Sequence, residues 1–226
     1  MLNIAIDGPS GSGKSSLARA VAKKLQIIYV DTGALYRTVG LYIKRRGIDP
    51  SDTAEVIAAL PDLSLSMTYE KGEQHIYLEG QDVGDTIRTP EIAMYASKVS
   101  AIPEVRAFLL DTQRSIAEKN SVIMDGRDIG TVILPNANVK IFLTASNEAR
   151  ARRRVAELHE KGIEATYEDI LRDMALRDEN DRTRAVAPAI PAEDAVFLDN
   201  SDLTAEETVA AVLRIIAEKT AEKGAK

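Results

Sequence analysis

The sequence predicts an α/β fold, in which a doubly wound parallel sheet of five strands forms the core. Short apolar runs near residues 4, 28, 123, 141 and 197 have the length and composition of buried strands. Segments with helical apolar periodicity alternate with these runs, as the crossovers of a parallel sheet require. A glycine-rich stretch directly follows the first run, where parallel sheets of this kind bind ligands. These three observations favour one main domain with smaller insertions.

The glycine-rich stretch fits the pattern G-x-x-x-x-G-K-[ST] of phosphate-binding loops. Backbone N–H groups in such a loop form a nest for anions, and the following helix adds the positive end of its dipole. We expect Lys14 beside the terminal phosphates of a nucleoside triphosphate and the Ser15 hydroxyl as a ligand of Mg²⁺. A plain glycine-rich turn is the alternative, but it does not explain Lys14 followed by Ser15. The expected nucleotide-binding residues are Gly8, Pro9, Ser10, Gly11, Ser12, Gly13, Lys14, Ser15 and Ser16.

Composition excludes several classes of protein. The 226 residues contain no cysteine and two histidines, which leaves neither a disulfide framework nor a cysteine zinc site. A net charge of −6 argues against a nucleic-acid-binding surface, so any anionic ligand must be met by local arginines. No stretch approaches the ~20 apolar residues of a membrane span. We therefore expect a soluble, cytoplasmic protein, with a monomer as the default.

The second strand, Gln26 to Val30, ends at Asp31-Thr32-Gly33 on the ligand side of the sheet. A helix from Gly33 to Arg46 should follow, with Leu35, Val39 and Tyr42 or Ile43 facing the core. Arg37 lies near the start of this helix, where a cation opposes the helix dipole. A bound anion nearby would explain Arg37, although a solvated surface arginine remains the alternative.

From about Asp62 the apolar residues alternate instead, which predicts a small inserted antiparallel hairpin with Gly72 at its turn. Two helix starts follow, at Thr89-Pro90 and at Pro103, and the second helix should run to about Lys119. Arg106 falls in the first turn of that second helix, so the dipole argument weakly favours a bound polar ligand there too.

The third core strand, Ser121 to Met124, ends in Asp125-Gly126-Arg127-Asp128-Ile129-Gly130-Thr131. Two carboxylates and an arginine at this strand end lie on the ligand side of the sheet. A structural ion pair is the alternative, because charges beside a core usually pair with one another. A further strand, Val139 to Leu143, precedes a helix that begins near Ser146 or Asn147.

Eight arginines lie between Asn147 and Arg184, a local cationic excess in an acidic chain. Arg150, Arg153 and Arg154 share one helical face, and Arg177, Asp181 and Arg184 share another. An ion-paired, solvated helical hairpin would look similar. Gly162 separates the two helices, which suits a mobile flap. The chain should close with a strand at Ala195 to Leu198 and a helix from about Thr204 to Lys219, followed by a frayed end.

Four segments, in order, resemble bacterial cytidylate kinases: Ile6 to Ser15, Asp31 to Arg37, Asp125 to Thr131, and Arg184-Ala185-Val186-Ala187-Pro188. The resemblance runs from the first strand to the last helix. It implies transfer of the γ-phosphate of ATP to CMP or dCMP, with Mg²⁺. It also implies one kinase domain with a core (about 1–35, 104–150 and 185–226), an acceptor-binding insertion (about 36–103) and a lid (about 151–184).

The resemblance also assigns roles to residues. Lys14, Arg127, Arg177 and Arg153 would be the catalytic groups, with Arg153 reaching the donor phosphates from the lid. Arg37, Arg127 and Arg177 would grip the acceptor phosphate, Tyr36 would pack beside the acceptor, and Asp181 would hold the sugar hydroxyls. The groups that read the base would be Thr32, Ser97, Arg106, Asp128 and Arg184. Some members of the family have serine where this chain has Thr32, a change that keeps the hydroxyl.

Two kinds of alternative remain at this point. One is a kinase of the same fold with another small acceptor, such as UMP, shikimate or dephospho-coenzyme A. The other is a non-catalytic nucleotide-dependent switch, because fold alone does not choose among such functions. A guanine-specific switch is disfavoured, since the sequence has no Asn-Lys-x-Asp motif.

Overall fold

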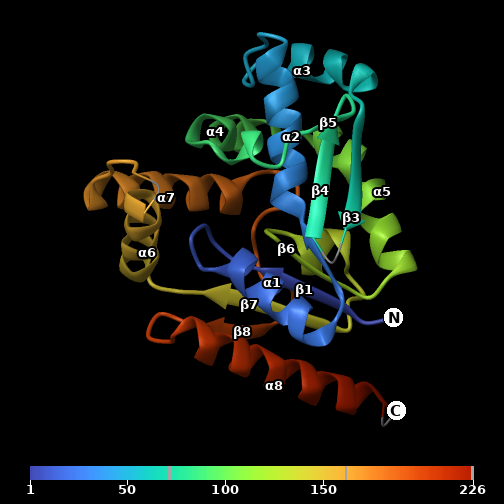
Figure 1. The fold of residues 1–226 in the computed structure, drawn as a ribbon, viewed down its shortest axis with the longest axis vertical. Helices are drawn as coiled ribbons and strands as arrows, with labels where there is room; N and C mark the ends of the chain where they lie inside the picture. Colours follow the sequence, from blue (N-terminus) through green and yellow to red (C-terminus); the bar gives the residue numbers. More distant parts are fainter. Residues whose placement is uncertain (71–72, 161, 225–226) are drawn as a thin grey trace. The chain divides into compact units, whose positions relative to one another are not determined.

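The computed structural model describes residues 1–70, 73–160 and 162–224 (Figure 1). The chain divides into two compact units: unit 1 is Met1 with Gln26–Val122, and unit 2 is Leu2–Leu25 with Ile123–Lys226. Within the described residues, the helices are too short or too polar to cross a membrane. The partition into core, insertion and lid remains a prediction.

The main sheet confirms the predicted five parallel strands. Their order is β2-β6-β1-β7-β8, and β7 pairs in parallel with both β1 and β8. Residues on β1, β6 and β7 are almost all buried, which explains why these runs lack the alternation of a half-exposed strand. The strands are β1 (Asn3–Asp7), β2 (Ile28–Asp31), β6 (Val122–Gly126), β7 (Val139–Thr144) and β8 (Val196–Asp199).

The helices of unit 2 are α1 (Lys14–Leu25), α6 (Asn147–Glu160), α7 (Tyr167–Thr183) and α8 (Ala205–Gly224). Helix α1 starts inside the glycine-rich loop and buries Leu17 and Val21, as its periodicity predicts. It packs against α8, and α6 packs against α7 (Figure 1). Helix α8 continues beyond its predicted end at Lys219, and the last two residues of the predicted frayed end lie outside the described residues.

Unit 1 has its own core. Helix α2 lies against α4 so closely that a Cβ on Gly40 would be 2.9 Å from the backbone nitrogen of Ala96. Tyr42 is fully buried among apolar side chains and donates its hydroxyl to the carbonyl of Ala59 at 3.0 Å. The elements of this unit, besides β2, are α2 (Thr32–Arg45), α3 (Thr53–Ala59), η1 (Leu60–Asp62), β3 (Leu65–Glu70), β4 (Glu73–Leu78), β5 (Gln81–Asp82), η2 (Thr86–Arg88), α4 (Pro90–Val99) and α5 (Pro103–Lys119).

Three elements differ from the sequence-based expectation. The predicted hairpin is a three-stranded antiparallel sheet, because Gln81–Asp82 adds β5; the predicted turn at Gly72 lies outside the described residues. Helix α3 was not expected, although Asp52 accepts a capping hydrogen bond from the Glu55 backbone at 3.0 Å. A π-helical turn, η3 (Ile129–Ile133), follows β6.

Candidate functional site

The glycine-rich loop connects β1 to α1 and adopts a backbone that its glycines make possible. Gly8 has φ +147°, and a Cβ there would lie 2.0 Å from the carbonyl oxygen of Leu143 on β7. Gly11 has φ +71°, and a Cβ there would lie 2.5 Å from the Met174 side chain of α7. Both backbone conformations favour glycine, and at Gly8 the approach of the Leu143 backbone also leaves no room for a Cβ. Ser16 is exposed in the first turn of α1.

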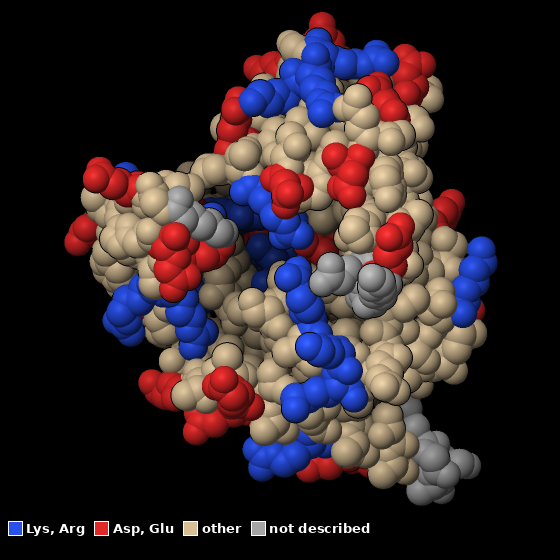
Figure 2. Space-filling model, viewed as in Figure 1, with Lys and Arg blue, Asp and Glu red and all other residues tan. Residues whose placement is uncertain are grey.

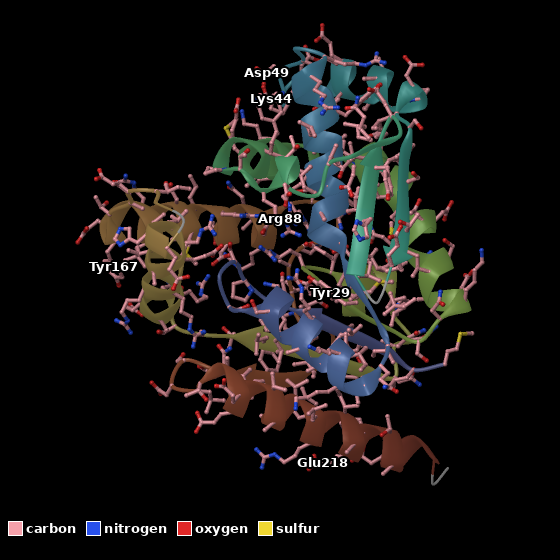
Figure 3. The ribbon with its side chains drawn as sticks, viewed as in Figure 1. Tyr29, Lys44, Asp49, Arg88, Tyr167 and Glu218 are labelled. Carbon is pink, nitrogen blue, oxygen red and sulfur yellow. The ribbon has the colours of Figure 1, made fainter. Side chains whose placement is uncertain are left out.

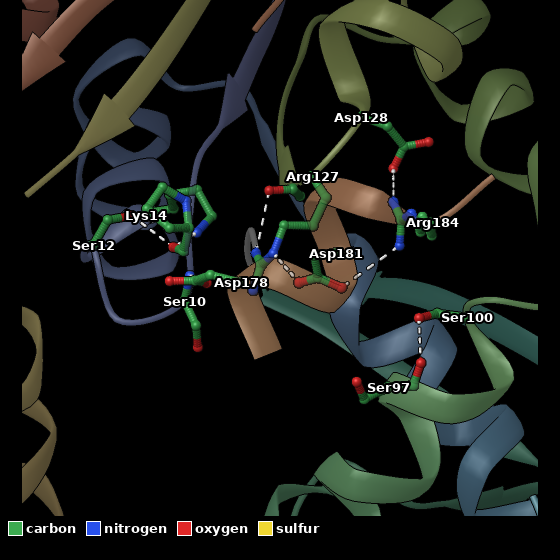
Figure 4. Close-up of polar contacts among 12 residues, drawn as sticks. Ser10, Ser12, Lys14, Ser97, Ser100, Arg127, Asp128, Asp178, Asp181 and Arg184 are labelled. Atoms are coloured by element: carbon green, nitrogen blue, oxygen red, sulfur yellow. Dashed lines mark hydrogen bonds and ion pairs between the residues drawn. The ribbon is translucent and has the colours of Figure 1, made fainter. Parts of the chain in front are cut away.

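Lys14 is buried and folded back onto the loop. Its ammonium group donates to the carbonyl of Pro9 at 2.6 Å and to the Ser12 hydroxyl at 3.3 Å (Figure 4). Burial, reinforced by the positive charge of Arg127, holds the pKa of Lys14 well below its ordinary value, and nearby carboxylates including Asp125 oppose that shift. The hydrogen-bond partners of the ammonium group are therefore neutral oxygens, which an anion could replace.

The hydroxyl of Ser15 donates to the carboxylate of Asp125 at 2.7 Å. Asp125 is buried at the end of β6, so the hydroxyl and the carboxylate come from neighbouring strand ends of the sheet. Hard oxygen ligands of this kind fit Mg²⁺. Among the described residues there is no cluster of three acidic or histidine side chains that could hold a metal ion.

A second buried aspartate, Asp7, joins the loop to the segment after β6. Its two carboxylate oxygens accept the backbone N–H groups of Ile129 at 2.8 Å and Gly130 at 2.7 Å. These are the first two N–H groups of η3, which the turn cannot satisfy internally. Asp7 thus fixes the segment that carries Arg127 and Asp128.

Carboxylates and arginines alternate in a second cluster of unit 2. The Arg127 Nε donates to Asp181 at 2.8 Å, while Arg184 lies 3.5 Å from Asp128 and 3.7 Å from Asp181 (Figure 4). Burial raises the pKa of Asp181, but the charges of Arg127, Arg177 and Arg184 outweigh it and hold the pKa below its ordinary value. The cluster therefore favours the ionised form of Asp181, and its ion pairs orient the arginines.

Helix α7 ends at Thr183, so Arg184 is not part of the helical face predicted for Arg177 and Asp181. Its backbone is extended, and its Nε donates to the carbonyl of Ala187 at 2.6 Å. The side chain still reaches Asp181 from there. The predicted proximity is confirmed, although the helix does not provide it.

The arginines of α6 and α7 fall into two groups. Three of the arginines form ion pairs with acidic residues on their own helix. On the face drawn in Figure 2, basic and acidic side chains are mixed. The ion-paired alternative is correct for these three pairs: Arg154 with Glu157, Arg172 with Asp169, and Arg182 with Glu179. By contrast, Arg150 is buried, and its guanidinium donates to the carbonyl of Ser10 at 2.7 Å.

Arg153 contacts the loop indirectly. Its guanidinium donates to the side chain and the backbone carbonyl of Asn200, at 3.1 and 2.6 Å. Asn200 in turn donates its amide to the carbonyl of Ser12 at 3.1 Å. Arg153 is therefore one residue removed from the loop in this structure.

The predicted site residues of unit 1 surround the start of α2. Asp31 caps the helix by accepting from the Ala34 backbone at 2.9 Å, and it also accepts from Arg37 at 2.9 Å. Arg88, labelled in Figure 3, lies 3.9 Å from the same carboxylate. The backbone N–H of Asp31 donates to Gln74 at 2.7 Å. Arg37 is thus neither freely solvated nor dependent on a ligand for its charge balance.

The other unit 1 residues lie on α2, α4 and α5. The guanidinium of Arg106 stacks over the Tyr36 ring at 5.3 Å and donates to the carbonyl of Ser100 at 3.1 Å. The backbone carbonyl of Ser97 accepts a hydrogen bond from the Ser100 hydroxyl at 2.9 Å (Figure 4). The side chain of Thr32, at the start of α2, is buried. Tyr36 and Arg106 thus form a cation–π pair.

Sequence reasoning did not single out several residues that hold these groups. Asp7 and Asn200 each stand at or just after the end of a core strand, a position that could have identified them. Gln74 and Arg150 had no comparable signal, because only the fold brings them to their partners.

Comparison with known proteins adds independent information. The family model described as cytidylate kinase matches residues 4–218. A cytidylate kinase from Fervidobacterium nodosum is 49% identical over 96% of each chain, and one from Thermosipho melanesiensis is 47% identical over 96% of this chain and 97% of the relative. A solved structure of an uncharacterized protein from Eubacterium ventriosum has a TM-score of 0.54 at 14% identity, covering 96% of this chain and 98% of the other. That last similarity concerns the fold alone.

Proposed function

Because this chain belongs to the cytidylate kinase family, we propose that it transfers the γ-phosphate of ATP to CMP or dCMP, giving ADP and CDP or dCDP. The main structural support for the proposal is that unit 2 contains two separate groups of residues able to bind phosphate. One compact unit holds both a phosphate-binding loop with Lys14 and a separate arginine cluster around Asp181. A protein that only binds ATP would not need the second cationic cluster.

The donor end of the proposed site is the loop from Gly8 to Ser16 with Lys14. Its N–H groups and the Lys14 ammonium would bind the donor phosphates. Ser15 and Asp125 would hold Mg²⁺, which neutralises charge on the phosphates when it is bound. Arg153 would need to release Asn200 to reach the donor, so its role depends on movement of α6.

For the acceptor phosphate, we propose Arg37, Arg127 and Arg177. A guanidinium binds phosphate through two parallel N–H bonds and does not lose its charge near neutral pH. The Nε of Arg37 is buried and has no hydrogen-bond partner among the described residues, which supports a ligand at this position. A phosphate monoester loses its second proton near pH ~6, so the acceptor needs no strong general base. Positioning and charge stabilisation are the main tasks of these residues.

For the base, we propose that Thr32, Ser97, Arg106, Asp128 and Arg184 read the cytosine edge. Asp128 with Arg106 offers acceptors and donors that match the amine, N3 and O2 of cytosine, whereas uracil reverses part of that pattern. A buried polar group left unpaired costs about 1–3 kcal/mol, enough for a ten- to hundredfold preference. Asp181 would hold the sugar hydroxyls, and Tyr36 would pack beside the acceptor.

A panel of acceptors tests this function. ADP formation would be measured with CMP, dCMP, UMP, AMP and shikimate, for the parent protein and for Asp128→Ala. We expect the highest kcat/KM with CMP and dCMP, and a larger loss for CMP than for UMP in the variant. ADP formation with another acceptor alone would refute the substrate assignment. ATP binding without ADP formation on any acceptor would favour the alternative of a non-catalytic nucleotide-dependent switch.

A further inference from the structure

The N–H of Ser10, in the middle of the glycine-rich loop, already has an anionic partner. It donates to the Oδ1 of Asp178 at 2.9 Å, although 168 positions separate the two residues (both are labelled in Figure 4). Asp178 is on α7, in the segment predicted to form the lid. A side chain from the lid thus contacts the loop backbone directly.

Two further contacts place α7 on the loop. Met174, one turn before Asp178, is 8% exposed, and its terminal methyl lies 2.5 Å from where a Cβ on Gly11 would be. Arg150 donates both to the Ser10 carbonyl and to the second oxygen of Asp178. Apolar and charged contacts therefore support the same position of the helix.

The chemistry of this contact is that of the ligand expected in the loop. A carboxylate oxygen accepts a backbone N–H as a phosphate oxygen does, and an N–H group forms one strong hydrogen bond at a time. Asp178 also raises the pKa of Lys14 against the larger effects of burial and Arg127, so its charge acts on the lysine of the loop as well. Its side chain is 20% exposed, which leaves it accessible to exchange with a solute.

We propose that Asp178 sets the affinity for the phosphate donor by competing with the donor phosphates for the N–H of Ser10. The inference rests on the proposed function, since it requires that the loop bind ATP. The loop accepts the donor only in the fraction of molecules in which Asp178 has left, and the apparent affinity falls by that fraction. Asp178 therefore acts against donor binding, whereas a residue that positions Arg150 for the donor would act in its favour.

The sign of the effect on ATP binding decides between these roles. Calorimetry with Mg-ATP and no acceptor would compare the parent protein with Asp178→Asn and Asp178→Ala. We expect ATP to bind about tenfold more tightly to Asp178→Asn, which loses the charge of one charge-assisted hydrogen bond, and at least as tightly to Asp178→Ala. Inorganic tripolyphosphate should show the same gain, because the competition concerns phosphate and not the adenine base.

The neighbouring Glu179→Gln is the matched control. It makes the same charge change on the same helix, but Glu179 is exposed and pairs with Arg182, so its ATP affinity should be unchanged. Circular dichroism at the titration temperature would confirm that each variant is folded; the alanine variant supplies the answer if the asparagine variant is unstable. Unchanged or weaker ATP binding in a folded Asp178 variant would overturn the inference. Lys14→Ala distinguishes failure of this inference from failure of the proposed function. If Lys14→Ala binds ATP with normal affinity, the assignment of the loop as the ATP site is wrong.

Discussion

At the scale of single residues, Asp181 organises the arginine cluster of unit 2. It accepts from Arg127, lies near Arg184 and feels the charge of Arg177. An ionised, largely buried carboxylate costs free energy unless several cations compensate it. Here the compensation also fixes the directions of the guanidinium groups before any ligand binds, which lowers the cost of ordering them around a phosphate.

Arg127 should be the most sensitive position of this cluster. We expect Arg127→Ala to lower kcat by about two to three orders of magnitude, because it removes a preorganised hydrogen-bond donor that positions the acceptor phosphate for attack. Far-UV circular dichroism should show an intact fold. Arg182→Ala, an exposed arginine that pairs with Glu179, is the matched control and should turn over normally. A near-normal rate for Arg127→Ala would make Arg127 a structural residue.

Asp7 should introduce a pH dependence into stability. Burial, with a smaller contribution from Asp128, raises its pKa to about 6 against the opposing N–H bonds and Lys14. An aspartate in the unfolded chain titrates near pH ~3.9. Between those values the folded protein holds a proton that the unfolded chain has lost, so this contribution to stability is present at low pH and disappears as pH rises to about 6.

Asp7→Asn cannot titrate and tests this linkage. Relative to the parent protein, its free energy of unfolding should improve as pH rises from about 4 to about 6.5, by at most about 2–3 kcal/mol. Urea unfolding at several pH values measures the difference. Parallel curves for the two proteins would show that Asp7 has an ordinary pKa in the folded state.

The positions of some candidate site residues were predictable from the sequence, whereas their roles stay predictions. Lys14, Ser15, Arg127 and Asp128 follow strand ends and were identified from that position. The pairings were harder to predict, because Arg127 meets Asp181, and Ser10 meets Asp178, only through the fold. Long-range hydrogen bonds of this kind leave no local pattern.

At the scale of elements, the tight contact of α2 with α4 depends on one glycine. Gly40→Ala places a Cβ 2.9 Å from a backbone atom of α4, so one helix must shift. Overpacking costs about 1–3 kcal/mol, and the gain of ~1 kcal/mol in helix propensity does not offset its upper range. We expect a net loss of stability of about 1–2 kcal/mol by urea unfolding. Equal or greater stability would mean that the helices separate easily.

The elements with strong periodicity or strong caps were predicted well. Helix α4 begins after Thr89 with Pro90 at its first position, and α5 begins with Pro103, as expected. Short elements were missed because their local signals are weak: β5 has two residues, and η3 forms where Asp7 satisfies its N–H groups from another strand. Tertiary contacts, rather than propensity, stabilise these elements.

At the scale of the whole molecule, water is a competing acceptor for the phosphate, so the lid should close only when both substrates are bound. We expect amide exchange between Arg153 and Asp173 to slow strongly with a non-hydrolysable ATP analogue plus CMP, and little with CMP alone. Mass spectrometry of deuterium uptake measures this. Equal protection of that segment with and without ligands would contradict closure.

The ends of unit 1 meet. The backbone N–H of Ile28, near its start, donates to the carbonyl of Ser121, near its end, at 3.1 Å. Five of the ten residues proposed to bind the acceptor lie between these points: Thr32, Tyr36, Arg37, Ser97 and Arg106. The other five, Arg127, Asp128, Arg177, Asp181 and Arg184, lie outside them, as does the glycine-rich loop. A segment that leaves and rejoins the chain at one place can be replaced as a cassette. Exchange of one continuous stretch of gene can therefore change the unit 1 part of the proposed acceptor site, without altering Asp128, Arg184 or the loop proposed to bind ATP.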